Sequence, residues 1–141
     1  QTVLDAGCGT GNYLPALASK VARVEGVELN PGMLETARTK MVNHQEVTLQ
    51  QGSVLELPIE SESCDGVVVN YVLHHLEDGS DESFAATRSS VAEFSRVLAP
   101  GGTLVRHMGH ARPSSEPVVS KCVARQSAQK LCEHGSSTGL A

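Results

Sequence analysis

Glycine stands at three alternate positions near the start of the chain, in the stretch LDAGCGTGNY that covers residues 4–13. An apolar run with the composition of a strand, 2–6, precedes the glycines, and a segment with leucines at helical spacing, 12–21, follows them. Glycine adopts backbone angles that other residues avoid, and it lets a ligand approach the main chain closely. A glycine-rich turn between a strand and a helix is typical of nucleotide-binding sites. The chain is therefore predicted to begin with a strand–loop–helix unit that binds a ligand.

Strand-like and helix-like segments alternate beyond this unit. Asn30 suits a helix cap and Pro31 the first helical position, and Met33 is expected on the buried face of that helix with Leu34, Ala37 and Met41. Phe84 and Phe94 are expected to point inward from the next helix. Strands are predicted at 23–29, 46–50, 66–69 and 103–106, and helices at 31–41 and 81–98. This alternation predicts an α/β fold with a doubly wound, mostly parallel sheet, in which ligands lie at the carboxyl ends of the strands.

The character of the sequence changes from His110 onward. The sequence predicts a domain over 1–109 and a linker-like tail over 110–141, with one amphipathic helix at 119–131 and a disordered end. No sixth or seventh strand is predicted, so the strand at 103–106 would present an unpaired apolar edge through which the chain could self-associate. The oligomeric state is left open. Because the chain starts with Gln1 and enters a strand at once, we interpret it as incomplete.

Composition narrows the classes of partner. Eleven basic and sixteen acidic residues give a formal charge of −5, which argues against nucleic acid as the main partner. No apolar run approaches the roughly 18 residues of a membrane span. The four cysteines include no CxxC pair, so no zinc ribbon or thioredoxin-type site is supported. Because Cys8 lies inside the glycine loop, we interpret the cysteines as reduced thiols of a cytoplasmic protein. The histidines and carboxylates lack the spacing of metal ligands, so no metal site is predicted.

The glycine loop has the spacing GxGxG, with Gly7, Gly9 and Gly11, rather than the GxGxxG of dinucleotide-binding loops. Asp5, two residues before the first glycine, would repel a pyrophosphate. A ligand with an adenosine part, no phosphate and a positive centre fits better. DAGCGTG resembles the first motif of the class I S-adenosyl-L-methionine (SAM)-dependent methyltransferases, and the resemblance extends over about residues 2–107, closest to the small-molecule group that includes quinone- and sterol-type enzymes.

Four further segments resemble family motifs in the same order: GVELNPGMLETAR, QQGSVLELP, CDGVVVNYVLHHL and RVLAPGGTLV. The resemblance implies a Rossmann-like methyltransferase fold with SAM as cofactor. It also implies that Glu28 accepts both ribose hydroxyls, that the position of Ser53 meets the adenine amino group, and that Asn70 lines the methionine end. The family commonly has Asp where this chain has Ser53, so one charged acceptor is missing. Asp5 is expected to hold backbone N–H groups of the loop and to face the sulfonium.

The leading hypothesis is a SAM-dependent methyltransferase that acts on an unidentified small molecule. A sulfonium is already activated, so the protein mainly supplies proximity, orientation and exclusion of water, and no catalytic residue is assigned. His74 and His75 are considered as a base only for an acceptor that must lose a proton. The alternatives are a non-catalytic SAM-binding module or truncated inactive fragment and, less favoured, an NAD-dependent oxidoreductase.

Overall fold

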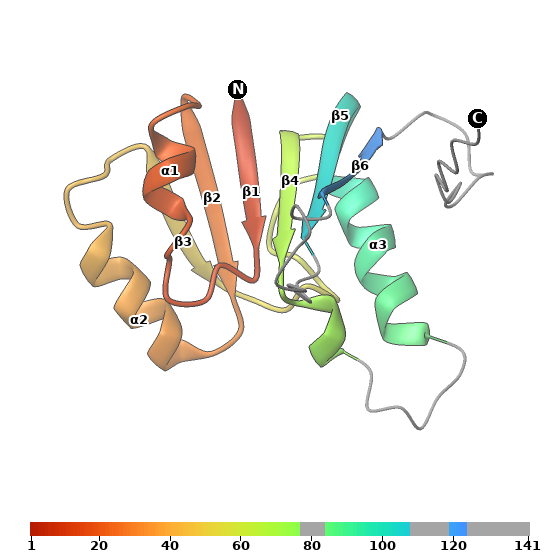
Figure 1. Ribbon diagram of the computed structural model, residues 1–141, viewed down its shortest axis with the longest axis horizontal. Helices are drawn as coiled ribbons and strands as arrows, with labels where there is room; N and C mark the ends of the chain where they lie inside the picture. The colour runs from red at the N-terminus through yellow and green to blue at the C-terminus, as the bar shows by residue number, and fades with distance from the viewer. Residues whose placement is uncertain (77–83, 108–118, 124–141) are drawn as a thin grey trace, which may run out of the picture.

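The computed structural model describes residues 1–76, 84–107 and 119–123. Their strands form one six-stranded sheet in the order β3-β2-β1-β4-β5-β6 (Figure 1). Strands β1 to β5 run parallel, and β6 is antiparallel to β5. The elements are β1 (Thr2–Ala6), α1 (Leu14–Ala18), β2 (Arg23–Glu28), α2 (Pro31–Lys40), β3 (Val47–Gln51), β4 (Cys64–Asn70), the 3₁₀ helix η1 (Leu73–His75), α3 (Ala85–Val97), β5 (Leu98–His107) and β6 (Val119–Val123). The predicted doubly wound α/β fold is confirmed.

Side chains alternate between the two faces of the sheet, and a core lies on each. On one face Val24 packs with Leu14 and Ala37, from α1 and α2. On the other face Leu4 and Val67 pack with Phe94 of α3. The carboxyl ends of β1, β2 and β4 point to the same edge, where the glycine loop, the first turn of α2 and η1 gather (Figure 1). Because every loop at this edge follows a strand end, residues far apart in the sequence meet there.

Asn30 caps α2 as predicted, because its Oδ1 accepts hydrogen bonds from the backbone N–H groups of Gly32 and Met33 at 2.9 and 3.1 Å. The prediction that Met33 is buried is wrong, since this residue is 42% exposed. The inward placement of Phe84 is also wrong. Phe84 has a left-handed φ of 51°, precedes the first turn of α3 and is 58% exposed. Both residues lie at the edge of the sheet where α2 and α3 begin, beyond the part of each helix that packs on the core.

Strand β6 corrects the prediction that no sixth strand follows β5. Residues 119–123 pair with β5 in antiparallel register, from Thr103 with Val123 to His107 with Val119, so a sixth strand is present and the predicted helix is wrong over these residues. The remainder of that helix, 124–131, and the predicted disordered end lie outside the described residues. Unpaired backbone groups along β5 favour an added strand over a helix. The proposed self-association through an open β5 edge therefore loses its basis.

Within the described ranges, no helix combines the length and the apolar character that a membrane crossing requires.

Candidate cofactor site

The glycine loop turns sharply between β1 and α1. Gly7, Gly9 and Gly11 have φ values of 78°, 56° and 77°, a region that favours glycine. The backbone N–H groups of Gly7 and Cys8 both donate to the carbonyl oxygen of Val27, at 2.8 and 3.0 Å. The loop is therefore attached to the end of β2, beside the first turn of α2.

The three glycines differ in the space around them. A Cβ on Gly7 would lie 2.3 Å from Cγ2 of Val72, and one on Gly11 would lie 3.0 Å from Cβ of Ala37. A Cβ on Gly9 would meet, among the described atoms beyond its chain neighbours, only Cε of Met33 at 3.7 Å. Gly7 and Gly11 are thus required by packing inside the protein, whereas a side chain at Gly9 would make only an ordinary contact with Met33. Among the three, Gly9 has the environment expected of a residue that a ligand contacts.

Glu28 joins the glycine loop to the start of α2. Its Oε2 accepts a hydrogen bond from the N–H of Gly9 at 2.9 Å, and its Oε1 accepts one from the N–H of Asn30 at 2.8 Å. Each carboxylate oxygen has a second lone pair, so Glu28 retains acceptor capacity for a ligand. The backbone carbonyl of Glu28 accepts from the N–H of Gly52 at 3.1 Å, which brings the segment after β3 to the same place.

Asp5 lies on β1 directly before the loop and is 1% exposed. Neither of its carboxylate oxygens has a hydrogen-bond partner among the described residues. Burial, and then the negative charge of Glu28, raise the pKa of Asp5 to about 7. The expectation that Asp5 holds the N–H groups of the loop is wrong, because Val27 and Glu28 accept those hydrogen bonds. A buried, unpaired carboxyl group is costly, and it marks a place where a cation or a donor would be stabilised.

The neighbouring thiol of Cys8 is also buried. Burial and the charges of Asp5 and Glu28 raise its pKa to about 12. Since the thiolate is the reactive form of cysteine, this thiol is unreactive at neutral pH. Its position in the loop reflects its small size.

Ser53 lies two residues after the end of β3, and Asn70 ends β4. The Oγ of Ser53 accepts a hydrogen bond from the N–H of Leu55 at 3.1 Å and has one further acceptor position. Asn70 is the last residue of β4 and pairs with His107 of β5. The residue before it, Val69, pairs with Ala6 of β1, so the end of β4 lies beside the glycine loop. The predicted site residues therefore share one edge of the sheet.

His74 and His75 lie in η1, which follows β4 at the same edge. His75 is exposed. In the described part of the chain, no group of three or more His, Cys, Asp or Glu residues is arranged to hold a metal ion.

Tyr71 was not among the predicted site residues; it follows Asn70 and has a left-handed φ of 55°. A positive φ is uncommon for a bulky residue, and residues with such a conformation are often found at functional sites. Three more apolar residues are exposed on segments that follow strands: Leu29 lies directly after β2, Met33 in the first turn of α2, and Leu55 in the connection after β3. Their exposure depends on how the chain packs, so no local pattern in the sequence indicates it.

A hollow with a volume of about 440 Å³ lies elsewhere, between the sheet and the connection that follows β3. It is lined in part by Thr2, Arg23 and Glu25, from the first halves of β1 and β2. Nε of Arg23 donates to Oε1 of Glu25 at 2.7 Å. Ligands of doubly wound sheets bind at the carboxyl ends of the strands, so this hollow is distinct from the predicted site.

A glycine loop after β1, a carboxylate at the end of β2 and the order β3-β2-β1-β4-β5 are typical of α/β proteins that bind an adenosine-containing cofactor. A sequence profile described as a methyltransferase domain matches residues 4–106. The chain belongs to this family, within the class I SAM-dependent methyltransferases.

Two relatives share 33% identity with the chain. One is an uncharacterized 37.1 kDa protein in transposon TN4556 of Streptomyces fradiae, matched over 96% of this chain and 39% of its own length. The other is the demethylmenaquinone methyltransferase of Staphylococcus aureus strain JH9, matched over 72% of this chain and 40% of its own.

A solved structure also matches the chain. The SAM-bound amino pentose methyltransferase CalS10 of Micromonospora echinaspora is 35% identical, with a TM-score of 0.62, over 74% of this chain and 41% of that one. The chain thus spans about 40% of the length of these relatives. These matches give no support to the NAD-dependent oxidoreductase.

Proposed function

We propose that this chain binds SAM at the carboxyl edge of the sheet and takes part in methyl transfer to a small molecule. The observation that carries the proposal is the position of Glu28, whose carboxylate joins Gly9 of the glycine loop to Asn30 at the start of α2. Both of its oxygens keep a lone pair for the two hydroxyls of a ribose. The unpaired carboxyl of Asp5 and the space at Gly9 support the fit of a cationic cofactor.

Each site residue has a distinct proposed role. Gly9 lets the cofactor approach the backbone, Glu28 binds the ribose, and Ser53 accepts a hydrogen bond from the adenine amino group. Asn70 lines the methionine end, and Asp5 lowers the free energy of the positive charge. Gly7 and Gly11 keep the loop in shape by packing against Val72 and Ala37. SAM, when bound, supplies a methyl group that its sulfonium already activates, so the residues of the chain bind, orient and exclude water.

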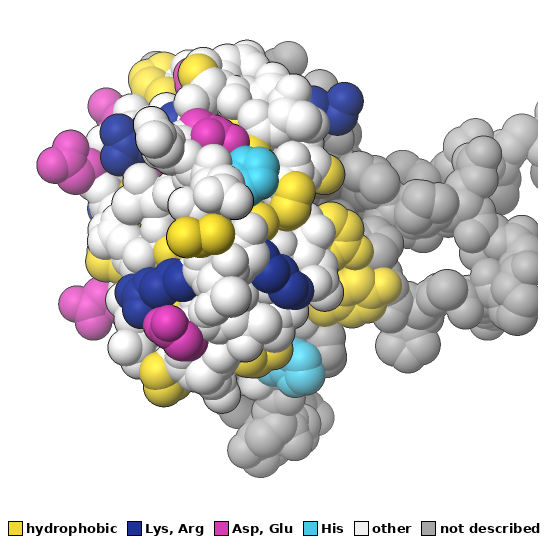
Figure 2. All heavy atoms as spheres, turned by 90° about the vertical axis from the view of Figure 1, so that its left-hand side faces the viewer, with side chains coloured by type: hydrophobic (Ala, Val, Ile, Leu, Met, Phe, Trp, Pro, Cys, Tyr) yellow, Lys and Arg dark blue, Asp and Glu magenta, His cyan; other side chains and the backbone are white. Residues whose placement is uncertain are grey.

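We infer a small-molecule acceptor from the relatives, which include methyltransferases named for demethylmenaquinone and for an amino pentose. On the side of the molecule that carries α1, α2 and β3, acidic and basic side chains are interspersed (Figure 2). A nucleic-acid backbone is usually met by a field of one sign, so this side supports no such partner. His74 or His75 would serve as a base only for an acceptor that must lose a proton.

We further propose that residues 1–109 form the cofactor-binding unit, to whose sheet β6 adds one strand. Cys8 and Cys64 are buried, and their thiols are free. Reduced thiols favour a cytoplasmic location.

The test is a calorimetric titration of the chain with SAM, S-adenosylhomocysteine and NAD, followed by a methyl-transfer assay over a panel of small acceptors. SAM binding with transfer is the expected result. Binding without transfer would favour the non-catalytic SAM-binding module, and preferential binding of NAD would overturn the proposal.

A further inference from the structure

The connection between β3 and β4, residues 52–63, forms neither helix nor strand apart from one isolated bridge. It crosses one face of the sheet, because β2 and β1 lie between the two strands that it joins. Parallel strands are usually joined through a helix, which satisfies its own backbone hydrogen bonds. An irregular segment must find other partners for these groups.

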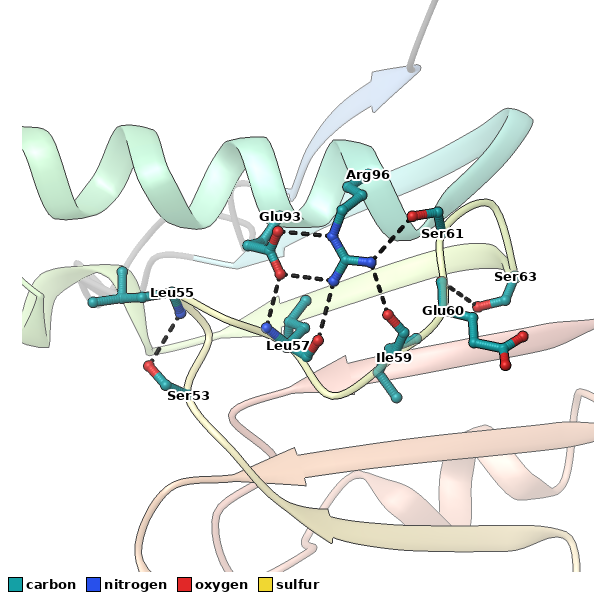
Figure 3. Close-up of polar contacts among 9 residues, drawn as sticks. All are labelled: Ser53, Leu55, Leu57, Ile59, Glu60, Ser61, Ser63, Glu93 and Arg96. Carbon is teal, nitrogen blue, oxygen red and sulfur yellow. Dashed lines mark hydrogen bonds and ion pairs between the residues drawn. The ribbon is translucent and has the colours of Figure 1, made fainter.

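The ion pair between Glu93 and Arg96 on α3 supplies hydrogen-bond partners for backbone groups of this segment (Figure 3). The guanidinium of Arg96 donates from Nη2 to the carbonyl oxygen of Leu57 at 3.0 Å, and from Nη1 to that of Ile59 at 2.8 Å and to Oγ of Ser61 at 3.2 Å. Oε2 of Glu93 accepts from the N–H of Leu57 at 2.8 Å. Two side chains of one helix thus hold the segment at three of its residues.

The two side chains of the ion pair meet through two hydrogen bonds. Nε and Nη2 of Arg96 donate to the two oxygens of Glu93 at 2.8 and 2.7 Å, an arrangement with two parallel hydrogen bonds. The hydrogen bond from Arg96 holds the pKa of Glu93 below its usual value. The carbonyl oxygen of Arg96, in the last turn of α3, accepts from the N–H of Glu62 at 2.9 Å. Beneath these contacts Leu57 and Ile59 are buried in the core.

The anchored segment leads directly to Ser53. The N–H of Gly52 donates to the carbonyl oxygen of Glu28 at 3.1 Å, and the N–H of Glu56 donates to that of Ser53 at 3.2 Å. A Cβ on Gly52 would lie 2.6 Å from Cδ of Pro58, so the two ends of this turn pack tightly. Ser53 is therefore fixed on one side by Glu28 and on the other by the segment that Arg96 holds.

We propose that the Glu93–Arg96 pair, outside the cofactor site, positions Ser53 and thereby sets how well the protein recognises the adenine amino group. The inference rests on the proposed function, because it assigns the adenine end of SAM to Ser53. Arg96 is a positioning residue that acts through the segment 52–63. Without the guanidinium, the carbonyl groups of Leu57 and Ile59 lose their donors and the turn at Ser53 is no longer held in one place.

The experiment measures selectivity between two probes, S-adenosylhomocysteine and its analogue with hydrogen in place of the 6-amino group. We expect the wild-type chain to bind the amino compound about fivefold more tightly, the value of one ordinary hydrogen bond. Arg96→Met should reduce this ratio to about one, since the acceptor is misplaced. Arg96→Lys should retain part of it, because an ammonium pairs with Glu93 but cannot replace the planar fork.

The control is Arg38→Met. Like Arg96, Arg38 pairs with a glutamate three positions earlier on its helix, and its Nη1 lies 3.6 Å from Oε2 of Glu35 on the surface of α2. It should leave the ratio unchanged. A variant that binds both probes more weakly by the same factor would overturn the inference, because it would show a role in stability alone. If Arg96→Met does not fold, Glu93→Gln and Ser61→Ala test the same anchor, and an unchanged ratio in both would overturn it. A wild-type chain that binds neither probe would contradict the proposed function itself.

Discussion

Strand β2 carries Glu25 in its amino half and Glu28 at its carboxyl end, and the two carboxylates have different surroundings. At the carboxyl edge, Glu28 accepts from two backbone N–H groups of two loops. At the amino edge, Glu25 accepts from the side chain of Arg23 and lines a hollow of about 440 Å³. The carboxyl edge also holds the unpaired Asp5 and glycines with positive φ. Both edges thus hold a buried carboxylate oxygen without a partner among the described residues, Oε2 of Glu25 at one edge and both oxygens of Asp5 at the other, so the turn of three glycines with positive φ is what distinguishes the carboxyl edge.

The largest effect is expected for Gly9→Val. A branched side chain at φ 56° would occupy the space where the cofactor meets the backbone. We expect SAM affinity to fall by at least roughly 4 kcal/mol, with a loss in the free energy of unfolding of only about 1–2 kcal/mol. Titration calorimetry and chemical denaturation would measure the two quantities.

The matched variant is Gly66→Ala in the amino half of β4, where a Cβ would lie 3.4 Å from Cγ2 of Val3, an ordinary contact. It should leave SAM affinity unchanged. Normal binding by Gly9→Val would mean that the glycine loop is only structural.

Glu28→Ala removes the acceptor of two backbone N–H groups and the proposed acceptor of both ribose hydroxyls. We expect SAM binding to weaken by roughly 2–4 kcal/mol. Glu25→Gln, on the same strand at the amino edge, should change the dissociation constant by less than about twofold. An unchanged constant for Glu28→Ala would exclude Glu28 from the site, and equal losses for both variants would remove the distinction between the edges.

Asp5→Asn tests the unpaired charge through the pH dependence of stability. The pKa of Asp5 is raised from 3.8 to about 7 in the folded chain, so its protonated form is favoured by folding. The stability that this group contributes is complete below pH 3.8 and is lost as the pH rises through about 7. The free energy of unfolding of Asp5→Asn, relative to wild type, should therefore increase by roughly 4 kcal/mol between about pH 4 and about pH 8.

Denaturation curves at several pH values would measure this difference. A difference that stays constant with pH would show that the pKa of Asp5 is not raised, because the carboxyl is hydrated or paired in solution.

The smallest effect is expected for Ser53→Asp. A carboxylate accepts a stronger hydrogen bond from the adenine amino group than a hydroxyl does, so SAM affinity should rise by around 1 kcal/mol. Weaker binding would indicate that adenine lies elsewhere, or that the carboxylates of Asp5 and Glu28 already make the edge too negative.

Much of the carboxyl edge could be predicted from the sequence. The glycine spacing, the strand that ends at Glu28 and the cap at Asn30 depend on residues that are close in the sequence. Backbone preferences, side-chain periodicity and capping act over a few residues, so a local pattern is sufficient to indicate them. The parallel order of the sheet then follows from the alternation of strands and helices.

Tertiary structure alone decided the contacts between distant segments. Residues 119–123 have a pattern that also suits a helix, and the unpaired edge of β5 makes them a strand. Arg96 meets the carbonyl of Leu57 across 39 positions of sequence, and no local pattern indicates that contact. Among the described residues Asp5 lacks a partner, because Val27 and Glu28 accept the hydrogen bonds of the loop. Local patterns were thus sufficient to predict β1 to β5 and the edge at which their carboxyl ends meet, since these patterns act over a few residues. The strand at 119–123, the exposure of Met33 and the contacts of Arg96 depend on segments that meet only in the folded chain.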